Sequence, residues 1–220
     1  MARLKRTISW LLPQVISKSK GNVAPVLEVT WENGRKVLNG ERVNYSFGSL
    51  HDVFRIALRK ALPKKTKLQD ALILGFGTGS IATILTEEMG FTDLQLTGVE
   101  ADAEVIRLAR EEFDVQRFAN LQLVNERAEV YVQRSQEQFD LICVDVFVED
   151  TVPEACRSEA FFRDVSRLLR AKGKMVFNLM LAPEMDADAF RGLLETIFSK
   201  VEMHKVLPGD TPNLIFIATK

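Results

Sequence analysis

From Val53 onward, short apolar runs alternate with segments of helical spacing, and this alternation constrains the fold more than any other feature. The runs include "DALILGF", "LQLTGVE" and "FDLICVDVF", and each precedes a segment whose apolar residues recur every three or four positions. Continuous apolar runs are typical of parallel strands that are covered on both faces. The pattern therefore predicts an α/β protein with a mostly parallel sheet and helices on both faces, closed by the strand pair "KVEMHKVL" and "NLIFIATK".

The helices of this main region are expected where the apolar spacing is three to four residues. A helix over 80–89 is expected to end at Gly90, because glycine favours the left-handed conformation that closes helices. The other helices are expected over 53–62, 102–113, 129–134, 158–170 and 186–200, and two further strands within 120–126 and 173–181.

The region before Ser49 has a different pattern. Asn33-Gly34 and Asn39-Gly40 are turn signals between short runs of β-forming residues, which predicts small hairpins. The chain is therefore expected to divide into an N-terminal segment of residues 1–48 and a main domain of residues 49–220.

Composition limits the classes of partner. Lys and Arg number 29 and Asp and Glu 30, and the net charge of −1 provides no basic surface for nucleic acid. A small-molecule partner is expected instead. Cys143 and Cys156 lack metal-ligand spacing, so we expect no metal site and reduced thiols in a cytoplasmic protein.

The N-terminal stretch "MARLKRTISWLLPQVISKSKG" combines basic residues with a short apolar run. Pro13 interrupts that run and no convincing cleavage site follows, which favours a soluble protein without membrane attachment. The alternative is a peripheral amphipathic anchor formed by residues 1–20.

A glycine-rich loop follows the first strand of the main region. Gly75, Gly77 and Gly79 allow a tight turn and a close approach of the backbone to a ligand. Glu100 ends the next strand, 25 positions after Gly75, where a carboxylate can accept both hydroxyls of a ribose. The pair predicts a nucleoside site, the alternative being a tight turn followed by an exposed acid. Ser80 stands where a dinucleotide fingerprint has its third glycine, so the match to that fingerprint is imperfect.

Several longer segments resemble a known family. "LILGFGTGS", "VEADAEVIRLAREEF", "FDLICVDVF" and "VPEACRSEAFFRDVSRLLRAKGKMVFNL" are similar to the spermidine synthase branch of the class I S-adenosylmethionine-dependent methyltransferases. The resemblance runs from about Leu27 to the C-terminus. It implies a Rossmann-like methyltransferase fold with a seven-stranded sheet over residues 49–220, a small N-terminal β-hairpin region, and S-adenosylmethionine or decarboxylated S-adenosylmethionine as cofactor. Because β extensions of this family often cover a neighbouring subunit, a homodimer is possible.

The resemblance also implies roles for individual residues. Asp145 matches the acid that faces the attacking amine and helps to remove its proton, which would make it catalytic; the alternative is a turn or N-cap carboxylate. His51, Val146 and Phe147 are expected to contact substrate. The residues expected to bind the cofactor are Gly75, Gly77, Thr78, Gly79, Glu100, Ala101, Glu126, Arg127, Ala128 and Asp145.

Four departures from the family pattern bear on the reaction. Thr78 stands where polyamine synthases have an Asp that grips the aminopropyl amine of the donor, and Val148 replaces a second acid, with Glu149 and Asp150 just beyond it. Arg127 replaces the acid that contacts the adenine amino group. Glu126 or a backbone carbonyl would have to contact the adenine amino group instead.

A fourth departure lies at the start of the first helix. The family's Tyr-His-Glu sequence corresponds only loosely to Leu50-His51-Asp52, so the phenol is absent and the imidazole remains. For His51 the alternative to ligand contact is a surface or capping role.

Three functions remain open. A transferase that moves the methyl group of S-adenosylmethionine to a small nucleophile is favoured. The alternatives are a polyamine aminopropyltransferase, disfavoured because an ammonium in a buried pocket without a carboxylate is costly, and a non-catalytic nucleoside-binding protein with a degraded site.

Overall fold

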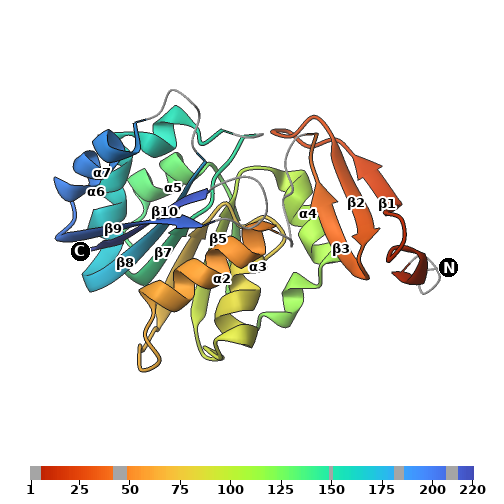
Figure 1. The fold of residues 1–220 in the computed structure, drawn as a ribbon, viewed down its shortest axis with the longest axis horizontal. Coiled ribbons are helices and arrows are strands. Elements are labelled where there is room, and N and C mark those ends of the chain that lie inside the picture. Colours follow the sequence, from red (N-terminus) through yellow and green to blue (C-terminus); the bar gives the residue numbers. More distant parts are fainter. Residues whose placement is uncertain (1–5, 42–48, 149–150, 181–185, 207–212) are drawn as a thin grey trace.

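The computed structural model describes residues 6–41, 49–148, 151–180, 186–206 and 213–220. Two sheets organise them (Figure 1). The smaller sheet is antiparallel and has the order β1-β2-β3, built from β1 (Gln14–Ser19), β2 (Leu27–Glu32) and β3 (Arg35–Asn39). The larger sheet has seven strands in the order β6-β5-β4-β7-β8-β10-β9. The sequence predicted both features.

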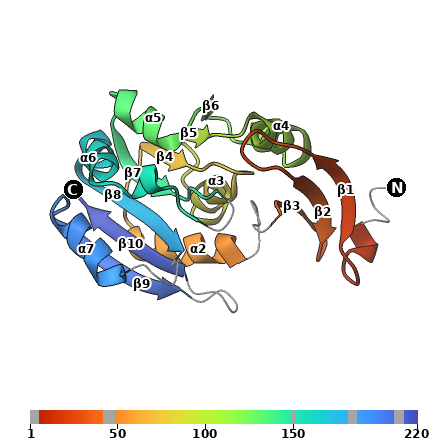
Figure 2. The same ribbon diagram turned by 90° about the horizontal axis from the view of Figure 1, so that it is seen from above.

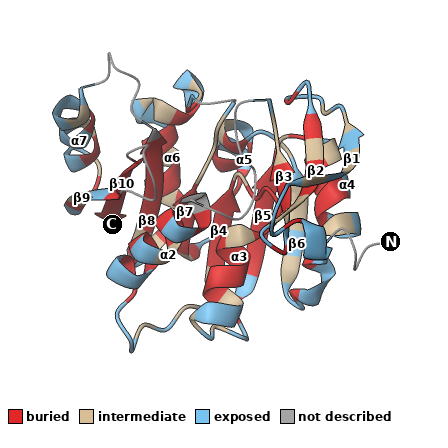
Figure 3. Ribbon diagram, turned by 45° about the vertical axis from the view of Figure 1, so that its right-hand side comes forward, coloured by how far each residue is buried: buried red, intermediate tan, exposed pale blue. Residues whose placement is uncertain are grey.

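Parallel pairing runs from β6 through β5, β4 and β7 to β8, and β10 is antiparallel to both of its neighbours. This arrangement confirms the predicted seven-stranded, mostly parallel Rossmann-like sheet. Figure 3 shows the central strands of this sheet, such as β4 and β7, as buried, whereas the edge strands β6 and β9 are more exposed. The strands are β4 (Asp70–Leu74), β5 (Gln95–Glu100), β6 (Leu121–Asn125), β7 (Phe139–Val144), β8 (Leu169–Met180), β9 (Lys200–Val206) and β10 (Asn213–Thr219).

Helices cover both faces of the large sheet because successive strand residues point to opposite sides. Ile73 and Cys143 pack with α2, α3 and α4 in one core, whereas Leu72 and Ile142 pack with α5, α6 and α7 in the other. The helices are α2 (Ser49–Ala61), α3 (Ser80–Thr83), α4 (Ala103–Glu112), α5 (Ala128–Arg134), α6 (Glu159–Leu168) and α7 (Ala187–Glu195). Short 3-10 turns lie over Val115–Arg117 and Glu154–Arg157.

The small sheet lies at one end of the molecule, beside α4 (Figure 2). Lys36 donates to the Glu112 carboxylate across this contact at 2.7 Å. Asn33 and Gly34, with φ of 48° and 75°, form the predicted turn between β2 and β3. The second turn signal, Asn39-Gly40, follows the end of β3, and the chain that a hairpin there would use falls within 42–48, outside the described residues.

Two of the expected helices differ in detail from the structure. The helix predicted over 80–89 is α only as far as Thr83 and continues as a π-helix over Ile84–Glu88, with Met89 N donating to Ile84 O. The helix predicted to reach Arg170 ends at Leu168, because Leu169 is extended and opens β8. Arg170 is therefore part of β8, and its guanidinium pairs with Asp70 and Asp140 at the starts of β4 and β7.

The N-terminal stretch also differs from its alternative interpretation. Gln14–Ser19 form β1, which pairs with β2, so residues 1–20 do not form one amphipathic helix. Within the described ranges, no helix combines the length and apolarity needed to cross a membrane. Cys143 and Cys156 are both free and buried.

Candidate functional site

A cavity of about 360 Å³ opens at the carboxyl ends of β4, β5 and β7. This is the edge at which ligands bind in parallel α/β sheets. Its walls come from the glycine loop, the end of β5, the start of α5 and the chain beyond β7. The lining residues are Asn22, Val23, Phe54, Gly75, Phe76, Gly77, Ser80, Ile81, Val99, Glu100, Ala101, Asp102, Glu126, Arg127, Ala128, Glu129, Asp145, Val146, Phe147, Val148 and Pro153.

The loop after β4 turns tightly against the end of β7. Gly75 has φ of 80°, and a Cβ at this position would lie 2.2 Å from the carbonyl oxygen of Asp145. The amides of Gly75 and Phe76 both donate to the Val99 carbonyl, which fixes the loop to β5 as well. Only glycine combines this conformation with this close approach.

Glu100 joins the end of β5 to the glycine loop. Its carboxylate accepts hydrogen bonds from the backbone amides of Gly77 and Asp102, each at 3.0 Å. Burial raises the pKa of Glu100, although these two hydrogen bonds act in the opposite direction. Each carboxylate oxygen can accept more than one hydrogen bond, so the group retains acceptor capacity for a ligand in the cavity.

Asp102 ties the N-terminal region to the site. Its carboxylate caps α4 through Glu104 N at 2.9 Å and also accepts from Val23 N at 2.8 Å and Ala24 N at 3.2 Å. Burial alone would raise the pKa of Asp102, but the backbone hydrogen bonds hold it below its usual value. These bonds bring Asn22 and Val23 into the cavity wall.

Asp145 directly follows β7. Its Oδ1 accepts a hydrogen bond at 3.0 Å from Nδ2 of Asn178, a fully buried residue on β8. Burial raises the pKa of Asp145 to about 7, although the Asn178 hydrogen bond lowers it. The carboxyl group can therefore change protonation state near neutral pH, as a general base must.

The start of α5 adds paired charges. Arg134 donates to Glu126 at 2.7 Å, and the Arg127 guanidinium pairs with Glu129 at 2.6 Å. Among the described residues, five carboxylates line the cavity against the single guanidinium of Arg127: Glu100, Asp102, Glu126, Glu129 and Asp145. Glu126 and Glu129 are paired with arginines, so Glu100, Asp102 and Asp145 are the lining acids that would suit a cationic ligand.

Most of the sequence-predicted site residues lie together in the cavity wall: Gly75, Gly77, Glu100, Ala101, Glu126, Arg127, Ala128, Asp145, Val146 and Phe147. Thr78, Gly79 and His51 are not part of this wall. Thr78 is buried, and a Cβ on Gly79 would lie in tight contact with the rings of Phe118 and Phe76, at 3.1 and 3.2 Å. His51 is buried between Ser80 and Glu88. Glu149 and Asp150 lie outside the described residues.

Sequence reasoning missed several residues of the site. Asp102 had a signal, because an aspartate directly before a helical pattern is a typical N-cap. Asn22 and Val23 had none, since their contact with Asp102 spans about 80 positions of sequence. Asn178 also gave no signal, because it interrupts an apolar strand without any neighbouring polar residue that would indicate its partner.

Comparison with known proteins places this chain in a family. A methyltransferase domain family model matches residues 66–206. The "Probable polyamine aminopropyl transferase" of Bifidobacterium longum (strain NCC 2705) is 32% identical over 143 residues, which are 65% of this chain and 31% of that protein. The chain spans about a third to a half of the length of the curated relatives it matches first.

Solved structures share the fold. A probable spermidine synthase from Corynebacterium glutamicum ATCC 13032 superimposes with a TM-score of 0.74 at 19% identity, over 92% of this chain and 79% of that one. Human Methyltransferase-like protein 13, solved in complex with SAH, gives a TM-score of 0.64 at 18% identity, over 79% of this chain and 83% of that one. The chain belongs to the methyltransferase domain family and has the fold of its spermidine synthase-like members.

Proposed function

We propose that this protein is a transferase that binds S-adenosylmethionine or its decarboxylated analogue and transfers a group to a small nucleophile beside Asp145. The observation that carries this proposal is Glu100, a buried carboxylate in the cavity wall that the Gly77 amide holds in place. A buried acceptor pair at the end of the second parallel strand suits the two hydroxyls of a ribose.

The acidic lining of the cavity suits the positively charged sulfonium of such a ligand. The sulfonium is cationic, and the lining carboxylates exceed the single lining guanidinium among the described residues. When bound, the sulfonium supplies an activated carbon that a nucleophile can attack. The chain's own contribution is to orient the nucleophile and to exclude water around it.

Asp145 is the residue that we assign to the proton of the nucleophile. Its carboxylate can accept a hydrogen bond from an incoming amine or hydroxyl and remove the proton as that group becomes acidic. Asn178 holds one carboxylate oxygen of Asp145, and Asp145 lines the cavity. Val146 and Phe147, next in the chain, are assigned to the acceptor pocket.

Methyl transfer is the first candidate reaction. Thr78 is not acidic, so the position that grips the aminopropyl amine of the donor in the resembling family carries no charge, and Val148 likewise replaces the second acid of the family's strand end. Thr78 is also only 1% exposed and does not line the cavity. One structural neighbour was solved with SAH, the co-product of methyl transfer.

Aminopropyl transfer is the second candidate. The acidic lining suits a donor that lacks the carboxylate of S-adenosylmethionine, since Arg127 is the one lining cation of the described residues and is already paired with Glu129. The names of the Bifidobacterium relative and the Corynebacterium structure also favour it.

The co-product identifies the reaction. The purified chain is incubated with small amines and hydroxyl compounds and with either S-adenosylmethionine or its decarboxylated form, and the adenosyl thioether is analysed by mass spectrometry. Methyl transfer leaves S-adenosylhomocysteine from the first donor, and aminopropyl transfer leaves methylthioadenosine from the second. We expect the first product. Formation of neither above a control without protein contradicts the transferase.

Glu100→Gln should weaken nucleoside binding tenfold or more, on the order of 1.5–3 kcal/mol for a charge-assisted hydrogen bond. The glutamine NH2 group would also face one of the two backbone N–H groups that donate to Glu100. Two donors cannot form a hydrogen bond with each other, so the loop loosens. Isothermal titration calorimetry with S-adenosylhomocysteine measures the effect. Glu111→Gln on the exposed side of α4 is the matched control. Equal affinity of both variants would show that Glu100 does not bind the ligand.

A further inference from the structure

A chain of three side chains leads from the cavity wall, through the buried His51, to the exposed residue Glu88. Ser80 lines the cavity, and its hydroxyl lies 2.7 Å from Nδ1 of His51. Nε2 of His51 lies 2.6 Å from a carboxylate oxygen of Glu88, the last residue of the π-helix. His51 itself is only 4% exposed, so the imidazole connects the two partners inside the fold.

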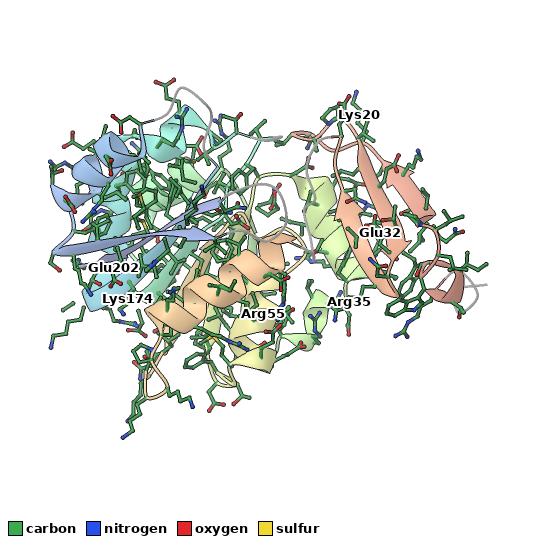
Figure 4. The ribbon with its side chains drawn as sticks, viewed as in Figure 1. Lys20, Glu32, Arg35, Arg55, Lys174 and Glu202 are labelled. Atoms are coloured by element: carbon green, nitrogen blue, oxygen red, sulfur yellow. The ribbon has the colours of Figure 1, made fainter. Side chains whose placement is uncertain are left out.

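The chemistry of the partners fixes the direction of these hydrogen bonds. An ionised carboxylate can only accept, and Arg55 on α2, which Figure 4 labels, lies 3.4 Å from the second oxygen of Glu88. The Nε2 atom of His51 therefore carries the proton. In the tautomer that carries only this proton, Nδ1 is an acceptor to which the Ser80 hydroxyl can donate.

A hydroxyl that donates inward presents its lone pairs outward. Ser80 follows the glycine loop of β4, and β4 lies between β5, which carries Glu100, and β7, which precedes Asp145. A nucleoside with its ribose at Glu100 and its sulfur near Asp145 passes this loop. The remaining substituent of the sulfur, which ends in an ammonium group, would then share this cavity with Ser80.

We propose that Ser80 accepts a hydrogen bond from the ammonium group at the end of the donor's side chain, with His51 and Glu88 as positioning residues that keep the hydroxyl oriented as an acceptor. This subsite rests on the proposed function. The Ser80 hydroxyl supplies a neutral, polarised acceptor two residues after Thr78. Thr78 itself is buried and does not line the cavity. The subsite also gives His51 a role in binding that acts through Ser80.

Two adenosyl thioethers isolate the contact. Methylthioadenosine has no ammonium group, whereas S-adenosyl-3-thiopropylamine has the same nucleoside with an aminopropyl chain. Titration calorimetry of both compounds against wild type, Ser80→Ala and Ser80→Thr gives six affinities. Ser80→Ala should lower the affinity for the amine tenfold or more and leave methylthioadenosine unchanged, since a hydrogen bond to a charged group is lost. Ser80→Thr keeps the hydroxyl and should restore the preference for the amine.

Glu88→Gln tests the positioning residues. An amide can donate to Nε2 of His51, which moves the ring proton to Nδ1 and turns the Ser80 hydroxyl outward as a donor. The affinity for the amine should fall while that for methylthioadenosine stays constant. Thermal unfolding of each variant checks that the fold is intact.

The outcomes separate the subsite from the function. If wild type binds neither thioether, the proposed function fails, and the subsite with it. If wild type binds both, and Ser80→Ala lowers both affinities equally or neither, the function stands and the subsite is contradicted. A loss confined to the amine, and reversed in Ser80→Thr, supports the subsite.

Discussion

Replacing Asp145 by asparagine should lower turnover by about 10²- to 10⁴-fold, the usual contribution of a general base. The amide keeps the shape of the side chain and an oxygen for the Asn178 hydrogen bond, but it cannot take a proton. Nucleoside affinity should change little, because ribose recognition is assigned to Glu100. Asp93→Asn, at an exposed loop position, is the control. Undiminished turnover in Asp145→Asn would remove Asp145 from the mechanism.

The raised pKa of Asp145 adds a pH dependence with a defined sign. Because the base must be ionised and its pKa is about 7, kcat/KM of the wild type should rise with pH through 7 and level off above it. The folded state disfavours the ionised carboxyl, so wild-type stability falls as pH rises from the ordinary aspartate pKa toward 7.

Asp145→Asn does not undergo that loss of stability. At pH 8 the variant should be more stable than wild type by up to about 4 kcal/mol, and the difference should vanish below pH 4. Urea unfolding at the two pH values measures it. A variant that is less stable than wild type at pH 8 would instead support a structural, turn-capping role for Asp145.

Gly75→Ala should lower the free energy of unfolding by about 2–5 kcal/mol, the combined cost of a left-handed alanine and of overpacking. The new Cβ would lie 2.2 Å from the Asp145 carbonyl oxygen, so the loop or the end of β7 must move. Ligand binding and turnover should fall with it, because both Glu100 and Asp145 are positioned by this contact.

Gly90→Ala is a matched control for this prediction. Gly90 has nearly the same φ, 81° against 80° at Gly75, but a Cβ there meets nothing within 4 Å. Its substitution should cost only the conformational part, about 1–2 kcal/mol. Chemical denaturation of both variants gives the difference. Equal costs would show that the close approach of the loop to β7 does not contribute.

Much of the fold follows from local patterns. The apolar runs of β4, β5 and β7 are buried on both faces, so each is continuous in sequence and predicts a parallel strand. β1 was not predicted, because "QVISKS" has no apolar alternation and forms a strand only through pairing with β2. The π-helical turn was missed for a similar reason: the apolar spacing of Ile84 and Leu85 does not distinguish it from α-helix.

The site was less predictable than the fold. Residues attached to a strand end, such as Gly75 and Glu100, were placed in one cavity because topology alone brings strand ends together. Contacts between distant segments required the three-dimensional structure. The Asp102 bonds to Val23 and Ala24, the Asn178 bond to Asp145 and the His51 link from Ser80 to Glu88 belong to this class.

The central claim is that the cavity beyond β4, β5 and β7 binds an adenosyl sulfonium or thioether. Titration calorimetry of the wild-type chain with S-adenosylmethionine, S-adenosylhomocysteine, methylthioadenosine and NAD tests it most directly. We predict saturable one-to-one binding of the adenosyl sulfur compounds, a melting temperature that rises with their concentration, and no such response to NAD. Absence of binding by all three adenosyl compounds, or preferential binding of NAD, would contradict the account.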